Sequence, residues 1–239
     1  MSAAIELAGA RAETDGGSAG VTLTVETGEF LTLVGPARSG KGVILKLCAG
    51  LIEPVEGTVR VLDCELAGLD EEALIDLRMR VGIVLQPPGL LSNMTVYNNV
   101  ALPLRYHRGL SDEEIRPLVE AELESLGMAA LAERFPAQLT PGEARGAAIA
   151  RAMILGQELL LLDEPTDGMD AGMIKRLGRL LTERRRARRL TIVLTLHDFS
   201  SLLECADRVA FVRDGRIEAI GRHAELLATA GEDLKDYLS

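Results

Sequence analysis

The 239-residue sequence lacks several features that mark particular classes of protein. No run of 18 apolar residues occurs, and no charged segment followed by an apolar one opens the chain, so we expect a protein that neither spans a membrane nor is exported. The three cysteines, Cys48, Cys64 and Cys205, show no C-x-x-C spacing and form an odd set. This pattern predicts reduced core cysteines in a cytosolic protein.

Basic residues are also in the minority. The 26 Lys and Arg residues are outnumbered by 36 Asp and Glu residues, which gives a net charge of -10 and a pI near 4.9. Nucleic-acid-binding domains are usually basic, so we do not expect DNA or RNA as a partner. One local cluster departs from this balance: Arg184, Arg185, Arg186, Arg188 and Arg189. It fits either a solvated helix end or a contact with anionic lipid head groups.

What the sequence does contain is an ordinary globular mixture, with 47% hydrophobic and 26% charged residues. The length suits one large domain, or a core that carries an inserted subdomain. Strand-like and helix-like apolar runs alternate along the chain, which predicts the α/β class.

Apolar runs and period-two alternation predict the strands. They are Ile5–Leu7, Val21–Val25, Phe30–Val34, Thr58–Val61, Val81–Leu85, Leu159–Leu162, Thr191–Leu196, Arg208–Val212 and Arg216–Ile220. A polar, glycine-rich turn is expected over Thr14–Gly20.

Helical spacing and capping residues predict the helices. One follows the glycine-rich loop and ends near Gly50, and others cover Glu71–Arg80 and Ala171–Arg186. Residues 87–157 are mainly helical, with one helix capped by Ser111 and Glu114 and another running from Thr140 to about Ile154. A pair of helices is expected at the end of the chain.

The segment Phe30–Val43, FLTLVGPARSGKGV, carries the strongest single motif. Gly35, Gly40 and Lys41 satisfy G-x-x-x-x-G-K, and only the last position departs, because Gly42 stands where Ser or Thr is expected. A strand, a glycine-rich loop and a helix are the context that a phosphate-binding loop needs, since backbone N–H groups and the helix N-terminus must converge on the anion.

Polar residues follow two buried strands further along the chain. The four leucines 159–162 lead directly to Asp163 and Glu164, and Thr191–Leu196 leads to His197. An all-apolar run of this length is expected for a parallel strand buried on both faces. Because ligands of open α/β sheets bind at the carboxyl ends of such strands, we expect these three side chains to reach the phosphate loop.

The order of motifs resembles the ATP-binding subunit of ABC transporters over essentially the whole chain. The matching segments are similar to Walker A (Gly35–Lys41), the Q-loop glutamine (Gln86), an altered LSGGQ signature (Leu139, Thr140, Pro141, Gly142 and Glu143), Walker B with its glutamate (Leu159–Pro165), the D-loop (Asp167–Asp170) and the switch histidine (His197). Six motifs in the right order are far more specific than any one of them.

The resemblance implies a fold and a division of the chain. We expect a P-loop NTPase of the ABC ATPase type, with a RecA-like core, an inserted helical subdomain and an N-terminal antiparallel β-subdomain. The whole chain, 1–239, would form one ABC ATP-binding domain. Its core would comprise 1–86 and 158–239, and its helical subdomain 87–157.

The resemblance also implies the cofactors ATP and Mg²⁺ and a role for each motif. The expected nucleotide-binding residues are Gly35, Pro36, Ala37, Arg38, Ser39, Gly40, Lys41, Gly42, Val43 and Gln86. Lys41 would lie between the β- and γ-phosphates, and Asp163 with Gln86 would hold Mg²⁺. Glu164 would be the general base for the attacking water, and His197 would orient that water and contact the γ-phosphate. The signature residues 139–143 would act on the nucleotide of a partner copy.

Three departures from the family pattern leave activity open. Gly42 supplies no hydroxyl to the metal. In the signature, Pro141 lacks an N–H, and Glu143 either repels the phosphate, by about 4 kcal/mol for like charges ~4 Å apart at an effective dielectric of ~20, or folds back harmlessly onto Thr140 as a capping box. No aromatic residue precedes Glu29 to stack on adenine, so we expect weaker or less base-selective binding of the base, unless an aliphatic side chain or the stem of Arg11 takes this role.

The segment after Gln86, LLSNMTVYNNVALPLRYH, looks most like the Mla/Mce-type ATPases that drive phospholipid transport across the bacterial envelope. The implied partners are an inner-membrane ABC permease, a second ATPase copy (the same or a different cassette) and a periplasmic Mce-domain protein. The protein would sit on the cytoplasmic face of the inner membrane. Three alternatives stay open: a degenerate subunit that binds nucleotide with little hydrolysis, the ATPase of another importer class, and a soluble ABC protein acting on DNA, ribosomes or cell division.

Overall fold

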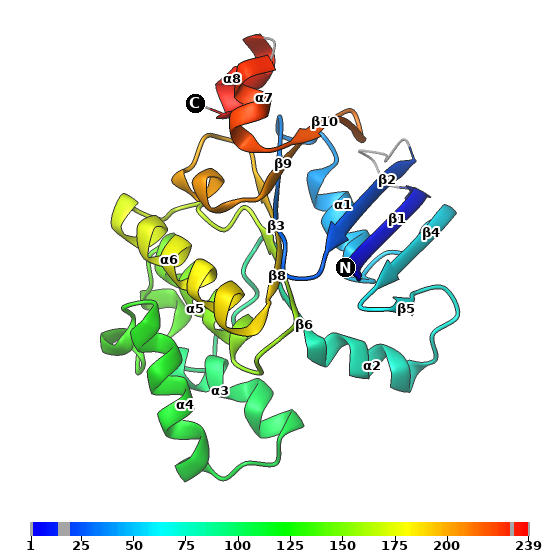
Figure 1. Cartoon of the computed structure of the whole chain (residues 1–239). Coiled ribbons are helices and arrows are strands. Elements are labelled where there is room, and N and C mark those ends of the chain that lie inside the picture. The colour runs from blue at the N-terminus through cyan, green and yellow to red at the C-terminus, as the bar shows by residue number, and fades with distance from the viewer. Residues whose placement is uncertain (1, 14–19, 230–231, 239) are drawn as a thin grey trace.

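The computed structural model describes residues 2–13, 20–229 and 232–238. The turn predicted over Thr14–Gly20 therefore lies outside the described residues, except for Gly20. Two sheets form the centre of the molecule, with helices between and around them (Figure 1).

The larger sheet has six strands in the order β10-β9-β3-β8-β7-β6. Its strands are β3 (Phe30–Val34), β6 (Val81–Val84), β7 (Leu159–Asp163), β8 (Thr191–Leu196), β9 (Arg208–Arg213) and β10 (Arg216–Gly221). All neighbours pair in parallel except β9 and β10, which form an antiparallel hairpin. The carboxyl ends of β3, β7 and β8 therefore lie at the same edge of the sheet.

The smaller sheet is antiparallel, in the order β2-β1-β4-β5. Its strands are β1 (Ala3–Arg11), β2 (Val21–Glu26), β4 (Glu56–Val61) and β5 (Cys64–Glu65). The predicted α/β class and the N-terminal antiparallel sheet are both confirmed. The first strand is longer than the predicted Ile5–Leu7, because β2 and β4 both pair with it along its length, with a register shift between Leu7 and Ala10.

The helices divide between the faces of the larger sheet, as Figure 1 shows. They are α1 (Lys41–Cys48), α2 (Glu71–Arg80), α3 (Val96–His107), α4 (Asp112–Ser125), α5 (Pro141–Met153), α6 (Ala171–Arg188), α7 (His223–Thr229) and α8 (Glu232–Leu238), with short 3-10 turns at 129–131, 136–138 and 201–205. Helix α1 lies between the two sheets, and α3 to α6 lie on the opposite side. No helix among the described residues is long and apolar enough to cross a membrane.

Alternate residues of each central strand enter two different cores, as the period of two requires. Leu159 and Leu161 of β7 join the core around α1, whereas Leu160 and Leu162 join the core under α3 to α6. All four leucines are fully buried. This two-sided burial explains why β7 is a continuous apolar run and why it presents its first acidic residue, Asp163, only at its end.

The arginine cluster at the end of α6 is partly engaged with the rest of the chain. Arg184 pairs with Glu122 of α4 at 2.6 Å, and Arg185 pairs with Asp207 at 2.7 Å and donates to the backbone oxygen of Gly28. Two of the five arginines therefore hold α6 to neighbouring elements, a role that neither a solvated helix end nor a lipid contact predicts.

Candidate nucleotide-binding site

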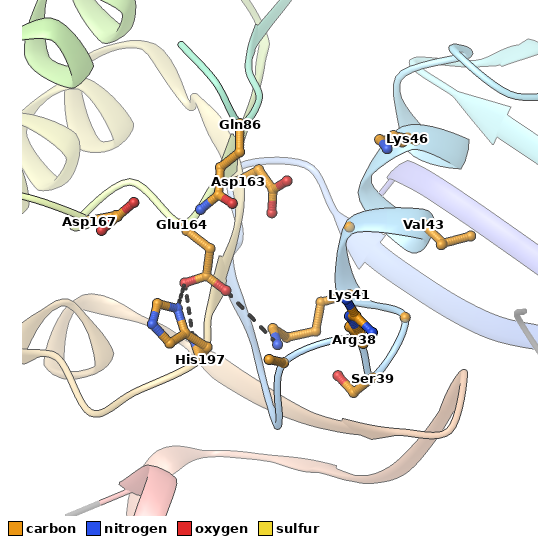
Figure 2. A pocket seen from close by; sticks show the side chains of 13 residues that line it. Arg38, Ser39, Lys41, Val43, Lys46, Gln86, Asp163, Glu164, Asp167 and His197 are labelled. Carbon is orange, nitrogen blue, oxygen red and sulfur yellow. Dashed lines mark hydrogen bonds and ion pairs between the residues drawn. The ribbon is translucent and has the colours of Figure 1, made fainter. Parts of the chain in front are cut away.

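A cleft of about 920 Å³ opens at the carboxyl edge of the larger sheet. It is lined by Ala37, Arg38, Ser39, Gly40, Lys41, Gly42, Val43, Lys46, Gln86, Asp163, Glu164, Asp167 and His197. Figure 2 shows the loop residues on one side of it and the carboxylates with Gln86 and His197 on the other. Its volume lies within the ~300–1,000 Å³ range of small-molecule sites.

The loop after β3 takes a path that its glycines allow. Gly35 has φ +146°, and a Cβ there would lie 2.1 Å from the backbone oxygen of Val212, so no side chain fits. Gly40, at φ +102°, is the N-cap of α1 and begins the helix in a conformation that L side chains rarely adopt. The first turn of α1, with Lys41, Gly42 and Val43, lines the cleft, and the start of a helix offers free N–H groups to an anion.

Lys41 reaches back across its own loop. Its Nζ donates to the backbone oxygens of Gly35 at 2.7 Å and Pro36 at 2.9 Å and lies 3.9 Å from Glu164 Oε1. Burial lowers the pKa of this ammonium, while the nearby Glu164 and Asp163 carboxylates act in the opposite direction. The carbonyl oxygens of Gly35 and Pro36 thus accept hydrogen bonds from the Lys41 ammonium, and phosphate oxygens can accept these bonds instead. Gly35 and Pro36 contribute to the site through these carbonyls, although neither lines the cleft.

Asp163 faces the loop directly opposite Gly42. A Cβ built on Gly42 would lie 3.5 Å from Asp163 Oδ2, which is ordinary van der Waals contact. The other carboxylate oxygen, Oδ1, accepts a hydrogen bond of 2.7 Å from the hydroxyl of Thr195. One oxygen of Asp163 is therefore fixed by the protein and the other is turned towards the start of α1.

Glu164 and His197 form a pair on the side of the cleft opposite the loop (Figure 2). Oε2 of Glu164 accepts from the backbone N–H of His197 at 2.9 Å and lies 2.8 Å from the ring Nδ1. Glu164 itself has φ +49°, an uncommon conformation for a residue with a side chain. The glutamate is thus held by the residue that follows β8, while its Oε1 faces Lys41.

The ring of His197 lies between two carboxylates. Its Nε2 is 3.1 Å from Asp198 Oδ2, so each ring nitrogen faces an acidic oxygen. The pKa of His197 is raised, above all by the hydrogen bond to Glu164, and burial opposes this shift. This shift favours the imidazolium form, which donates from both nitrogens, more than in an isolated histidine.

The signature segment lies away from the cleft, and none of residues 139–143 lines it. Glu143 Oε2 accepts from the backbone N–H of Thr140 at 2.8 Å, and the Thr140 hydroxyl accepts from the Glu143 N–H at 3.3 Å. Of the two conformations considered for Glu143, the structure has the capping box. Gly142 packs so closely on Gly168 that a Cβ would lie 2.3 Å from the Gly168 oxygen, which leaves no room for a side chain.

Two buried side chains at the site were not predicted from the sequence. Arg145 of α5 donates to the backbone oxygens of Leu85 and Asp163 and pairs with Asp167, each at 3.3 Å. Thr195 of β8 bonds to both Asp163 and Glu164. A polar residue inside a buried strand was the available signal for Thr195, but its partners depend on the register between β7 and β8.

Arg11, whose stem could substitute for an adenine-stacking aromatic, has another partner. Arg11 at the end of β1 forms an ion pair with Glu56 of β4. Its guanidinium therefore joins two strands of the smaller sheet. The residue is only partly exposed, and it is not among those that line the cleft.

The chain is similar in sequence to known proteins of one family. The family model described as "ABC transporter" matches residues 19–167, more than half of the chain. The chain is 36% identical over 203 residues to the methionine import ATP-binding protein MetN 2 of Paraburkholderia xenovorans, covering 85% of this chain and 52% of that protein. It is 37% identical over 212 residues to the sulfate/thiosulfate import ATP-binding protein CysA of Xylella fastidiosa, covering 87% and 59%. The chain thus spans little more than half the length of these two relatives.

Solved structures show the same arrangement of elements. The ATP-binding cassette MJ0796, solved as a dimer in a post-hydrolysis state bound to ADP and Pi, superimposes with a TM-score of 0.85 and 28% sequence identity, covering 91% of this chain and 98% of that one. A second dimeric structure of the same bacterial ABC transporter cassette gives a TM-score of 0.83 and 29% identity.

Proposed function

The chain belongs to the ABC transporter family, and we propose that it binds and hydrolyses ATP as a subunit of a membrane transporter. One observation carries the proposal. The loop that holds Lys41 faces Asp163 and the paired Glu164 and His197 across a single cleft of nucleotide size. The MJ0796 cassette, similar over nearly its whole length, holds ADP and Pi.

Lys41 and the loop would bind the phosphates. Phosphate oxygens would replace the Gly35 and Pro36 carbonyls at Lys41 Nζ, and the N–H groups of the loop and of the first turn of α1 would hold the remaining oxygens. Arg38 and Lys46 add positive charge to the same side of the cleft. The loop side of the cleft is therefore complementary in charge to a polyanionic ligand.

The residues opposite Lys41 fit a magnesium ion that shares its ligands with a nucleotide. Carboxylate and amide oxygens are ligands that Mg²⁺ prefers, and Asp163 and Gln86 supply them. Among the described residues no group of three or more His, Cys, Asp or Glu side chains could hold a metal alone. Phosphate oxygens and water would therefore complete the shell, and the ion would neutralise charge on the phosphates.

Glu164 would act as the general base. His197 binds Oε2 through its backbone and its ring, which leaves Oε1, on the Lys41 side, to accept the proton of the attacking water. His197 then has two roles in the proposal: it holds the base in place and it contacts the γ-phosphate.

The signature would complete the site of a second copy. The MJ0796 cassettes that this chain resembles were solved as dimers. The capping box at Thr140 holds the Glu143 carboxylate on its own backbone, which supports the alternative in which Glu143 does not repel a partner's phosphate. We also propose the division into a core, 1–86 and 158–239, and a helical subdomain, 87–157. We further propose two partners. One is a second ATPase copy, identical or different, and the other is a permease at the inner membrane.

We propose a phospholipid as the transported substrate. The segment that follows Gln86 supports phospholipid transport of the Mla/Mce type, with a periplasmic Mce-domain protein as a further partner. The relatives above are named for methionine and for sulfate or thiosulfate import. Proteoliposomes containing the protein and its permease, tested for ATP-driven movement of a fluorescent phospholipid and for uptake of labelled methionine or sulfate, separate these substrates.

ATP hydrolysis is tested by phosphate release from purified protein in Mg²⁺, with EDTA and Lys41→Ala as controls. We expect release that both controls abolish. Release no higher than that of Lys41→Ala, combined with retained ATP binding, would instead support the alternative of a nucleotide-binding subunit with little hydrolysis, which Gly42, Pro141 and Glu143 favour.

A further inference from the structure

Thr195 is a buried polar residue in the middle of the larger sheet. It lies near the end of β8, directly beside Asp163 of β7 in the strand register, and its side chain is fully buried. Because side chains alternate along a strand, Thr195 shares its sheet face with Val193, which packs in the core around α1. The hydroxyl therefore lies on the face of the sheet that packs against α1, the helix that follows the phosphate loop.

The hydroxyl makes two hydrogen bonds with defined directions. An ionised carboxylate accepts only, so Thr195 Oγ1 donates its single proton to Asp163 Oδ1, at 2.7 Å. The same oxygen accepts from the backbone N–H of Glu164, at 2.9 Å. One side chain is thus bonded to two consecutive acidic residues, to the carboxylate of the first and the backbone of the second.

These two bonds fix features on which the site depends. The first fixes Asp163 Oδ1 and leaves Oδ2 facing Gly42. The second binds the N–H of Glu164, whose backbone has φ +49°, a conformation that needs support from its surroundings when the residue has a side chain. Gly42 offers no hydroxyl to a metal at the loop. Metal binding there therefore depends more strongly on the orientation of Asp163.

We propose that Thr195 is a positioning residue that orients Asp163 towards the metal and sets the backbone of Glu164, so that one hydroxyl aligns the metal ligand with the general base. This inference rests on the proposed function. Loss of partners that orient metal ligands typically costs on the order of 10–100-fold in metal affinity or activity.

The chain offers a matched set of variants. Thr195→Val keeps the shape and removes the hydroxyl, whereas Thr195→Ser keeps the hydroxyl. Thr32→Val is the control, because Thr32 is equally buried in the neighbouring strand β3 and its hydroxyl has no hydrogen-bond partner among the described residues. A general effect of placing valine in this sheet would appear in Thr32→Val as well.

Two measurements test the proposal without relying on turnover. The first is amide hydrogen exchange at Glu164 in the nucleotide-free protein. The second is the affinity of the ATP-loaded protein for Mn²⁺, which prefers the same ligands as Mg²⁺, measured from the electron paramagnetic resonance signal of free Mn²⁺. We expect Thr195→Val to lose protection at Glu164 and to weaken Mn²⁺ binding by about tenfold or more, while Thr195→Ser and Thr32→Val match the wild type.

Wild-type Mn²⁺ affinity in Thr195→Val would overturn the proposal, even if protection at Glu164 were lost, because the hydroxyl would then be merely structural. Equal losses in Thr195→Val and Thr32→Val would overturn it too. A failure of the proposed function is recognised separately, as wild-type protein that releases no phosphate from ATP. In that case the Mn²⁺ and exchange measurements still decide the role of Thr195.

Discussion

One oxygen of the Glu164 carboxylate, Oε2, receives both the backbone N–H and the ring Nδ1 of His197, at 2.9 and 2.8 Å. The two residues follow neighbouring parallel strands, β7 and β8, so the sheet itself brings them together. His197 therefore orients the proposed base, and the remaining oxygen, Oε1, is the one that faces Lys41.

The pKa of His197 gives the first prediction. The hydrogen bond to Glu164 raises this pKa above its usual value of about 6.5, so the stabilisation from the charged pair is complete below that value and is lost as the pH rises through the folded-state pKa. In nuclear magnetic resonance titrations we expect Glu164→Gln to lower the pKa of His197, with His107 as an internal control. An unchanged His197 pKa in this variant would contradict the pairing.

Gly42→Ser tests the loop. A Cβ at this position meets Asp163 Oδ2 at an ordinary 3.5 Å, so the serine side chain fits, and its hydroxyl can add a ligand beside Asp163. We expect a lower half-saturating Mg²⁺ concentration for ATP binding. Gly42→Ala is the control because it fills the same space without a hydroxyl, and equal Mg²⁺ dependence in the two variants would show that the metal is held in another way.

Much of the fold could be predicted because the signals are local. The bounds of β3, of α2 and of β8 are as predicted, and the capping residues Ser111 and Thr140 begin α4 and α5 as expected. These features depend on apolar runs and on side chains three residues apart, which the sequence displays directly.

The rest depends on contacts between distant segments. The bonds of Thr195 require the register of β7 with β8, and Arg145 reaches three segments that meet only in the folded sheet. The sequence left both conformations of Glu143 open, because contacts in the folded structure decide whether its carboxylate bonds to Thr140 or faces a partner's phosphate. Ion pairs such as Arg184–Glu122, which join α6 to α4, were missed for the same reason.

Glu143→Gln tests the signature. The carboxylate is bonded to the Thr140 N–H, and glutamine keeps a carbonyl oxygen for that bond, so we expect unchanged turnover in this variant. Glu143→Ala removes the bond and should lower the free energy of unfolding by about 0.3–1.5 kcal/mol, measured by urea denaturation. Faster turnover in Glu143→Gln would instead show that the charge reaches a partner's phosphate.

The ion pair between Glu122 and Arg184 predicts a pH-dependent stability. Burial raises the pKa of Glu122 against the opposing effect of Arg184. Because a raised carboxyl pKa favours the folded state at low pH, Arg184→Leu, which removes the compensating charge, should cost about 3 kcal/mol of unfolding free energy near pH 8 and less at pH 5. Denaturant unfolding at the two pH values measures this, and a loss independent of pH would contradict the account.

The central claim, that Glu164 is the base of an ATPase, is tested most directly by Glu164→Gln. Glutamine keeps the shape but cannot accept a proton, so we expect wild-type affinity for ATP with turnover lowered by about 10²–10⁴-fold. Binding is measured by calorimetry and turnover by phosphate release in Mg²⁺, on dimeric protein with its permease. Equal turnover by Glu164→Gln and the wild type would contradict the claim.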